Sequence, residues 1–177
     1  MSQQRPLYER DPVAWQEYLA EGNAKQARKR VGCDLLIRDS ANRIFLVNPE
    51  YKPDWDLPGG MAEANESPVD AVARELREEL GLSRPVGPML CVDWVAPHSV
   101  WDDSLMFIFD GGVVRDDEFA DLRPRDRELL GFGFYDADSA EGLLRPYFWL
   151  RVQGALRALT TGRAAYLQNG TELGRPV

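Results

Sequence analysis

The sequence has little cysteine and no long apolar run. Its two cysteines, Cys33 and Cys91, each lie in an apolar, strand-like segment, so we expect buried thiols in a reducing compartment rather than a disulfide. No apolar segment approaches the length of a membrane-spanning helix, and residues 1–5 carry no signal-peptide pattern. These absences favour a cytoplasmic protein without a membrane partner.

Positive charge is also scarce. The 177 residues contain 21 Lys and Arg against 29 Asp and Glu, which gives a formal net charge of −8. A surface of this sign disfavours broad binding to nucleic-acid backbones, so we expect no DNA or RNA partner. It does not exclude small phosphorylated substrates, because a bound metal ion can reverse the local charge. The length suits one domain of ordinary size.

What the sequence does contain is a strong helix signal within residues 60–82. Ser67 is a suitable N-cap, Pro68 suits the first helical position, and Gly81 is a typical left-handed C-cap. Apolar residues recur with helical spacing and predict the face that packs on the core: Val69, Val72, Ala73, Leu76 and Leu80. A set of carboxylates is predicted to lie on a separate face.

Glu75, Glu78 and Glu79 lie at positions i, i+3 and i+4, so they crowd one face of this helix. Two of them fall in the last turn, where the helix dipole disfavours each negative charge by roughly 0.3–1 kcal/mol. Like charges at this spacing cost a further ~0.2–0.5 kcal/mol per pair. A cation should therefore complete the site, unless Arg74 and Arg77 simply pair with a solvated acidic face. Oxygen-only ligands indicate Mg²⁺ or Mn²⁺.

Residues 60–82 resemble the Nudix box, G-x5-E-x7-R-E-U-x-E-E-x-G-U, where U is aliphatic. Every specified position is filled: Gly60, Glu66, Arg74, Glu75, Leu76, Glu78, Glu79, Gly81 and Leu82. The resemblance implies an α/β protein, a Nudix-type α/β/α sandwich with a central mixed β-sheet. It also implies metal-dependent hydrolysis of a nucleoside diphosphate linked to another moiety, because divalent cations offset phosphate charge and activate water.

The resemblance further implies a set of metal ligands: Glu75, Glu78, Glu79 and the carbonyl of Gly60. Glu75 is either a further ligand or the general base. Arg74 would orient the glutamates, and Glu66 would fix the geometry between loop and helix. In the preceding turn, Gly59 and Gly60 allow the backbone to approach a ligand closely.

The surrounding pattern predicts a Nudix domain over residues 29–160, an N-terminal helical extension over 1–28 and a C-terminal tail over 161–177. A capped amphipathic helix is expected over 11–21, with Trp15 and Leu19 packed on the domain or on a second subunit, which favours a homodimer. Strands are expected at 31–37, 43–47, 89–96, 105–109 and 131–135, and a final helix at 148–159.

Outside the box the signals are weaker. Several acidic residues follow the strand expected at 105–109: Asp116, Asp117, Glu118, Asp121 and Glu128. In Nudix enzymes this region often supplies another ligand or the base, and Glu128 is the preferred candidate, against a solvated loop carboxylate. His98 is expected in a loop, where it touches substrate, moves a proton or has no role. Three aromatic residues are candidates to stack a base, unless they belong to the core: Trp94, Trp101 and Phe107. Of these, Trp101 is assigned to the substrate site together with His98.

Three functions remain open. The first is Mg²⁺-dependent phosphoanhydride hydrolysis with a preference for ADP-ribose or a nucleotide sugar, since ADP-ribose-cleaving Nudix enzymes often carry a proline near the position of Pro97. Normal or oxidised nucleoside triphosphates are the alternative substrates. The second function is a non-catalytic nucleotide-sensing module, which the intact box and the missing basic recognition helix disfavour. The third is isoprenoid diphosphate isomerisation, for which neither cysteine lies in a suitable context.

Overall fold

The computed structural model describes residues 5–115 and 128–173. Within these residues, eight strands form one mixed sheet in the order β6-β2-β1-β5-β4-β7-β8, with β3 paired to β1 beside this path. The central strand β1 pairs parallel with β5 and antiparallel with β2 and β3. The strands are β1 (Arg30–Arg38), β2 (Ile44–Pro49), β3 (Gly59–Met61), β4 (Met89–Val95), β5 (Ser104–Val113), β6 (Leu129–Tyr135), β7 (Ala165–Gln168) and β8 (Thr171–Glu172).

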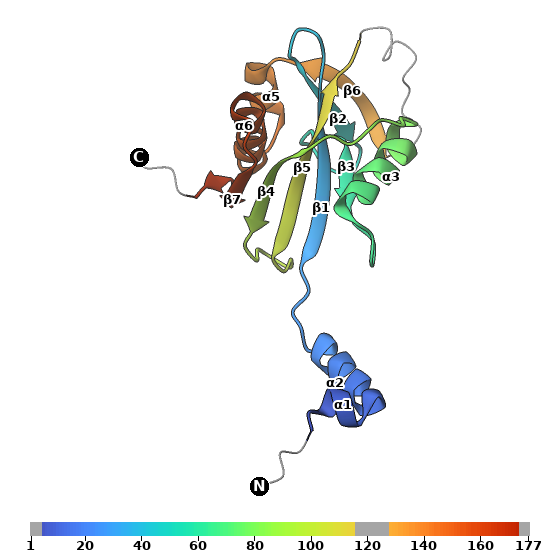
Figure 1. Ribbon diagram of the computed structural model, residues 1–177. Helices are drawn as coiled ribbons and strands as arrows, with labels where there is room; N and C mark the ends of the chain where they lie inside the picture. Colours follow the sequence, from blue (N-terminus) through green and yellow to red (C-terminus); the bar gives the residue numbers. More distant parts are fainter. Residues whose placement is uncertain (1–4, 116–127, 174–177) are drawn as a thin grey trace.

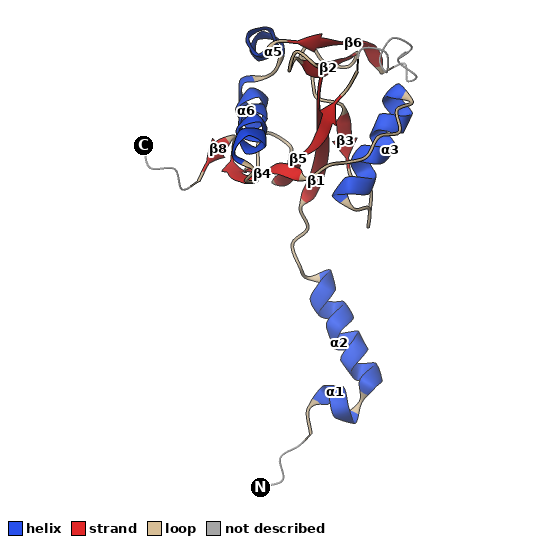
Figure 2. Ribbon diagram, turned by 45° about the horizontal axis from the view of Figure 1, so that its top comes forward, coloured by secondary structure: helices blue, strands red, loops and turns tan. Residues whose placement is uncertain are grey.

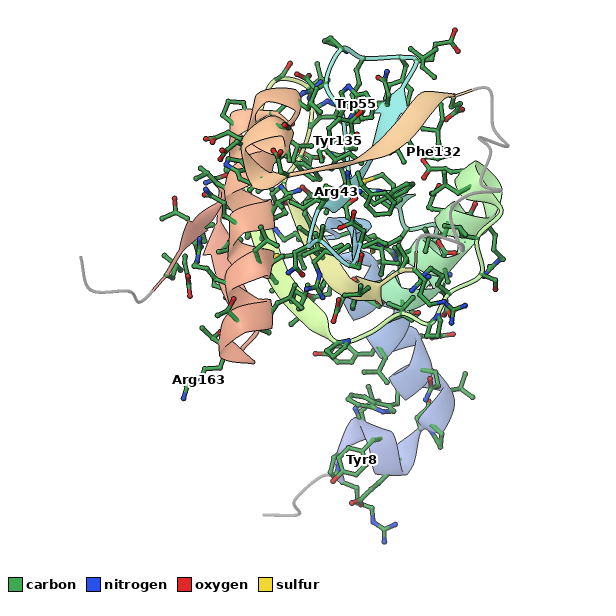
Figure 3. The ribbon with its side chains drawn as sticks, turned by 90° about the horizontal axis from the view of Figure 1, so that it is seen from above. Tyr8, Arg43, Trp55, Phe132, Tyr135 and Arg163 are labelled. Carbon is green, nitrogen blue, oxygen red and sulfur yellow. The ribbon has the colours of Figure 1, made fainter. Side chains whose placement is uncertain are left out.

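Helices cover both faces of this sheet (Figure 1). They are α3 (Pro68–Leu80) on one face and α5 (Ala137–Leu143) with α6 (Pro146–Thr161) on the other. Each face buries its own apolar cluster, which we call the α3-side and the α6-side cluster. Trp55 and Tyr135 pack against the α6-side cluster with their ring centroids 5.0 Å apart and their planes at 73° (Figure 3). The expected α/β/α sandwich with a mixed sheet is confirmed.

The alternation of β1 assigns its residues to the two faces. Cys33, Leu35 and Ile37 belong to the α3-side cluster, and Leu36 belongs to the α6-side cluster. Asp34 therefore occupies a position on the α6 side, where the strand would ordinarily carry an apolar residue. Cys33 is fully buried, as is Cys91, and both thiols are free, as expected. Burial raises the pKa of each thiol to about 12.

The N-terminal extension forms two helices, α1 (Leu7–Arg10) and α2 (Pro12–Ala24). Both lie away from the sheet (Figures 1 and 2), and neither contains a buried residue. Trp15 contacts Tyr8 and Tyr18, with ring centroids 6.1 and 5.4 Å apart, and Leu19 is 43% exposed. The structure thus does not place Trp15 and Leu19 on the domain, and their contact with a second subunit in a homodimer stays a prediction.

The C-terminal segment differs from the expected tail. Residues after 161 include β7, which pairs parallel with β4, and β8, which closes the edge of the sheet. Three other elements were not predicted, α1, β3 and α5, and the predicted strands and helices are mostly a few residues longer than expected. No helix in the described part of the chain is long and apolar enough to span a membrane.

Candidate active site

The turn and helix over residues 60–82 form as their sequence predicts. The Ser67 side chain accepts a hydrogen bond from the backbone N–H of Asp70, Pro68 opens α3, and Gly81 ends it with φ = 65°. The buried face of α3 consists of Ala71, Val72, Leu76 and Leu80. Val69, which was predicted on that face, is instead 43% exposed. The helix is therefore fixed at both ends and along one side, which holds its carboxylates in place.

Arg74 connects three of the box carboxylates. Its Nε and Nη2 donate to the two oxygens of Glu66 at 2.9 and 3.0 Å, and its Nη1 donates to Glu75 at 2.9 Å and to Glu78 at 3.0 Å. Nη2 also donates to the carbonyl of Met61 at 3.1 Å. A bidentate guanidinium pair is a strong, directional contact. Arg74 thus holds Glu75 and Glu78 in defined positions, which agrees with the orienting role predicted for it.

Glu66 ties the turn to the helix. Besides its two bonds from Arg74, its Oε2 accepts a hydrogen bond from the backbone N–H of Glu63 at 2.9 Å. The hydrogen bonds from Arg74 hold the pKa of Glu66 below its usual range. Glu66 therefore connects the loop before α3 to the middle of that helix, in the way that its predicted role requires.

Two glycines bring β3 close to β1 and to the glutamates. Gly59 has φ = +146°, and a Cβ there would lie 2.2 Å from the carbonyl oxygen of Cys33. A Cβ on Gly60 would lie 2.5 Å from the Glu75 carboxyl group. Only glycine fits these positions without a shift of the neighbouring backbone or carboxylate. The glycines thus allow β3 to pack closely on β1 and beside Glu75, and the close approach to a ligand stays a prediction.

Glu79 is the box carboxylate with a buried oxygen that lacks a hydrogen-bond partner in the described residues. It accepts a hydrogen bond from the backbone N–H of Gly59, but its Oε2 is buried with no hydrogen-bond partner among the residues that the structure describes. Burial, reinforced by the nearby charge of Glu75, raises the pKa of Glu79 to about 8. Burial also raises the pKa of Glu75, although Arg74 opposes that shift. Such shifts are common where a cation or a substrate is to bind.

The box residues fit a hard divalent cation in their chemistry. The donors are all oxygens, and the unpartnered Oε2 of Glu79 offers a ligand atom that the protein does not itself satisfy. In the described residues, no three Asp, Glu, His or Cys side chains are already gathered as a metal cluster. Arg74 accounts for part of this, because its guanidinium holds Glu75 and Glu78 in place of a metal ion.

A cavity of about 540 Å³ lies beside this turn. Four of the residues assigned to the substrate site from the sequence line it: Gly59, Gly60, His98 and Trp101. Trp101 is 53% exposed, and the Arg30 guanidinium lies 4.3 Å from its ring centroid. His98 Nδ1 lies 3.0 Å from the carbonyl oxygen of Ala96, in the turn between β4 and β5.

The two other aromatic candidates have structural contacts. Trp94 hydrogen-bonds to Asp103 through its Nε1 at 2.9 Å, and Phe107 packs against the α3-side cluster. Among the three candidates for stacking, Trp101 is therefore the one whose ring is open to the cavity.

Comparison with known proteins identifies the family. A sequence model described as the NUDIX domain matches residues 28–157, which is most of the chain. The chain belongs to the Nudix family.

Individual relatives of this Nudix domain are distant. The chain is 28% identical over 116 residues to the NAD-capped RNA hydrolase NudC of Chromobacterium violaceum, covering 63% of this chain and 40% of that protein. It is 39% identical over 51 residues to the 8-oxo-dGTP diphosphatase of Proteus vulgaris, covering 27% and 46% of the two chains. The chain therefore spans less than half the length of these relatives.

Solved structures support the same fold. The Nudix domain of NrtR from Shewanella oneidensis, determined with ADP ribose, matches with a TM-score of 0.64 at 18% identity, covering 81% of this chain and 97% of that one. At this identity the likeness shows the Nudix fold and does not extend to the ligand.

Among the acidic candidates that follow β5 in the sequence, Glu128 is the one that the structure describes. Asp116, Asp117, Glu118 and Asp121 lie outside the described residues. Glu128 precedes β6, and its carbonyl oxygen accepts a hydrogen bond from the backbone N–H of Glu50 at 2.7 Å. A catalytic role for Glu128 stays a prediction.

Sequence reasoning missed the charged residues on the other walls of the Nudix cavity: Asp34, Lys52, Asp56, Arg145 and Arg151. A signal existed only for Asp34, an acidic residue inside the apolar run of β1. The others come from a loop after β2 and from the beginning of α6, and tertiary folding alone brings them together.

Proposed function

We propose that this Nudix domain hydrolyses a nucleoside diphosphate linked to a second moiety, with Mg²⁺ as its cofactor and Mn²⁺ as a substitute. The observation that carries the proposal is the unpartnered, buried Oε2 of Glu79. It belongs to a carboxylate cluster beside a cavity large enough for a nucleotide. A buried carboxylate without a partner is costly, and a bound cation would remove that cost.

The residues divide into metal-holding and positioning groups. Glu75, Glu78, Glu79 and the Gly60 carbonyl would hold the metal ion, which when bound neutralises the diphosphate charge and lowers the pKa of a water molecule. Arg74 positions Glu75 and Glu78 through its guanidinium. The proton of the attacking water would pass to a carboxylate, with Glu75 and Glu128 as the two candidates.

The cavity residues would hold the substrate. Gly59 and Gly60 line the cavity next to the box glutamates, where the diphosphate would bind, and Trp101 offers an exposed aromatic ring. The preference for ADP-ribose or a nucleotide sugar rests on Pro97 alone. Nucleoside triphosphates, including oxidised ones, are the second candidate substrates, and the 8-oxo-dGTP diphosphatase relative supports their inclusion.

Nucleic acid is the less favoured kind of substrate because the net charge is −8. The relative named as an NAD-capped RNA hydrolase nevertheless makes capped RNA a compound to test.

A hydrolysis screen tests the proposal, with an added phosphatase that releases phosphate from the phosphomonoester products but not from the intact diphosphate compounds. The compounds are ADP-ribose, nucleotide sugars, dinucleoside polyphosphates, nucleoside triphosphates, oxidised nucleotides and NAD-capped RNA, each with Mg²⁺ and with Mn²⁺. We expect turnover of at least one diphosphate compound by the wild-type protein. Glu78→Gln and Glu79→Gln should lower kcat by orders of magnitude without loss of the fold, whereas Glu141→Gln, an exposed change on α5, should leave kcat unchanged. Full activity in either box variant would contradict the proposal.

A further inference from the structure

Asp34 is a buried carboxylate that the box does not use. It is 7% exposed and lines the cavity, and its Oδ2 has no hydrogen-bond partner among the residues that the structure describes. Its strand neighbours across β3 and β5 are Gly59 and Ile108. Neither of these side chains can donate a hydrogen bond. Within the described part of the chain, Oδ2 of Asp34 is therefore held in the cavity wall without a donor.

Of the four cations that line the cavity, Arg30 lies over the Trp101 ring, and the other three pair with acids other than Asp34. Arg151 pairs with Asp93 at 3.0 Å, and both side chains are almost fully buried. Arg145 pairs with Asp54 at 2.6 Å, and Lys52 pairs with Asp56. Asp34 has no such ion pair of its own within the described residues.

Burial raises the pKa of Asp34 to about 7, although the more distant charge of Arg151 opposes the shift. An unsatisfied buried group of this kind is rare in a stable fold and requires an explanation. Buried polar groups without a hydrogen-bond partner are expected mainly at functional sites.

We propose that Asp34 determines substrate specificity by accepting hydrogen bonds from a nucleobase that carries an amino group. This inference rests on the proposed function, since it assigns part of the same substrate. A carboxylate oxygen accepts from N–H groups, and guanine presents two neighbouring donors, a ring N–H and an amino group. A base edge that carries only acceptors would leave Asp34 unpaired.

The surroundings of Asp34 favour a base over a sugar. The same cavity is lined by the apolar side chains of Leu57, Met106 and Phe148. A flat ring fits apolar walls with few unsatisfied polar groups, whereas each sugar hydroxyl would need its own partner. Asp34 and Arg30 lie four residues apart on β1, about 13 Å at the rise of a strand. Arg30 lies against Trp101, so Asp34 and Trp101 can contact different parts of one substrate.

Calorimetric titration with nucleoside monophosphates and Mg²⁺ tests this assignment without requiring turnover. The compounds form matched pairs that differ in the amino group, GMP with IMP and CMP with UMP. We expect the wild-type protein to bind the amino-bearing member about 10-fold more tightly, the size of one good base contact. Asp34→Leu should bring that ratio close to one. Asp34→Asn, which keeps one acceptor oxygen and the shape of the side chain, should reduce it in part and serves if the leucine variant does not fold.

A second buried carboxylate provides the control. Asp39 is 2% exposed, lies outside the cavity, and accepts from Ala41 N, Arg43 N and Arg43 Nε at 2.6–3.0 Å. Asp39→Asn should lower Tm and leave the binding ratio unchanged. Asp34→Leu should instead keep or raise Tm while abolishing the ratio, because it removes an unsatisfied group.

Two results would overturn the assignment. An unchanged GMP-to-IMP ratio in both Asp34 variants would show that Asp34 does not contact the base. A loss of affinity for 2′-deoxynucleotides that disappears in the Asp34 variants would show that it binds the ribose. Failure of the proposed function would appear differently, as a wild-type protein that binds these nucleotides but hydrolyses none of the screened compounds.

Discussion

Replacing Glu79 by Gln should stabilise the metal-free protein while abolishing its turnover. The pKa of Glu79 is raised from 4.5 to about 8, mainly by burial. Each tenfold change in proton affinity is worth about 1.4 kcal/mol, so the full ionisation penalty is about 4–5 kcal/mol. Because Glu79 is only partly buried, we take about 3 kcal/mol as the working value. In a chain of this length that corresponds to a rise in Tm of roughly 6–12 °C.

The pH dependence follows from the direction of the shift. Between about pH 4.5 and 8 the folded protein keeps the Glu79 proton and the unfolded chain does not, so the folded state binds more protons. The stability of the wild-type protein therefore falls as pH rises through this window. The Gln variant lacks this loss, while its side-chain oxygen can still accept from the Gly59 N–H. The difference in Tm should be small at pH 5 and large at pH 8.

Thermal unfolding followed by circular dichroism, in EDTA at pH 5, 6.5 and 8, measures the effect. Glu78→Gln is the matched control, because the Glu78 side chain is 57% exposed and its contact with Arg74 is worth about 0–1 kcal/mol. With Mg²⁺ at pH 8 the wild-type protein should gain stability and the Glu79 variant should gain much less. A variant that is no more stable than wild type at pH 8, or equally more stable at pH 5, would refute the reasoning.

Three further changes have defined outcomes. Gly59→Ala should lower the free energy of unfolding by at least about 3 kcal/mol in urea titration, because φ is +146° and the new Cβ would meet the Cys33 carbonyl; an unaffected midpoint would contradict this packing. Arg151→Met should cost about 3–5 kcal/mol by leaving Asp93 buried without its partner, and adding Asp93→Leu should recover much of that loss. No recovery in the double variant would show that the pair is not the source. Deleting residues 1–24 should change Tm by less than about 2 °C, since α1 and α2 contain no buried residue, and a larger fall would reveal a contact with the domain.

Elements defined by neighbouring residues could be predicted from the sequence. The bounds of α3 follow from Ser67, Pro68 and Gly81, because capping and the left-handed C-cap are local interactions. The same holds for β1 and β2, which an Asp39-to-Asn42 turn joins and whose apolar residues recur in short runs. The contacts of Arg74 with Glu66, Glu75 and Glu78 also lie within one segment, but the sequence did not predict the contact with Glu66, and the orienting role of Arg74 stays a prediction.

Features that depend on distant segments could not be predicted. β7 has only four residues and becomes a strand by pairing with β4, more than 70 residues earlier in the chain. The ion pair between Arg151 and Asp93 joins α6 to β4, and nothing local identifies either residue as the partner of the other. The significance of Asp34 likewise depends on what faces it across the cavity. An acidic residue within an apolar strand departs from the expected apolar pattern. Only the folded structure shows whether that residue lies on the surface or in a binding site.

The guanidinium of Arg74 has a consequence for how the protein reaches its folded state. It acts as an internal counter-ion that pairs with Glu66, Glu75 and Glu78 and offsets part of their charge when the chain folds. Small domains that depend on a structural metal unfold when it is removed. Here α3 would carry the metal ligands. It is stabilised without a metal ion by Arg74, by its two caps and by its buried apolar face. Chelation should therefore switch the enzyme off reversibly, leaving a folded protein that regains activity as soon as Mg²⁺ returns.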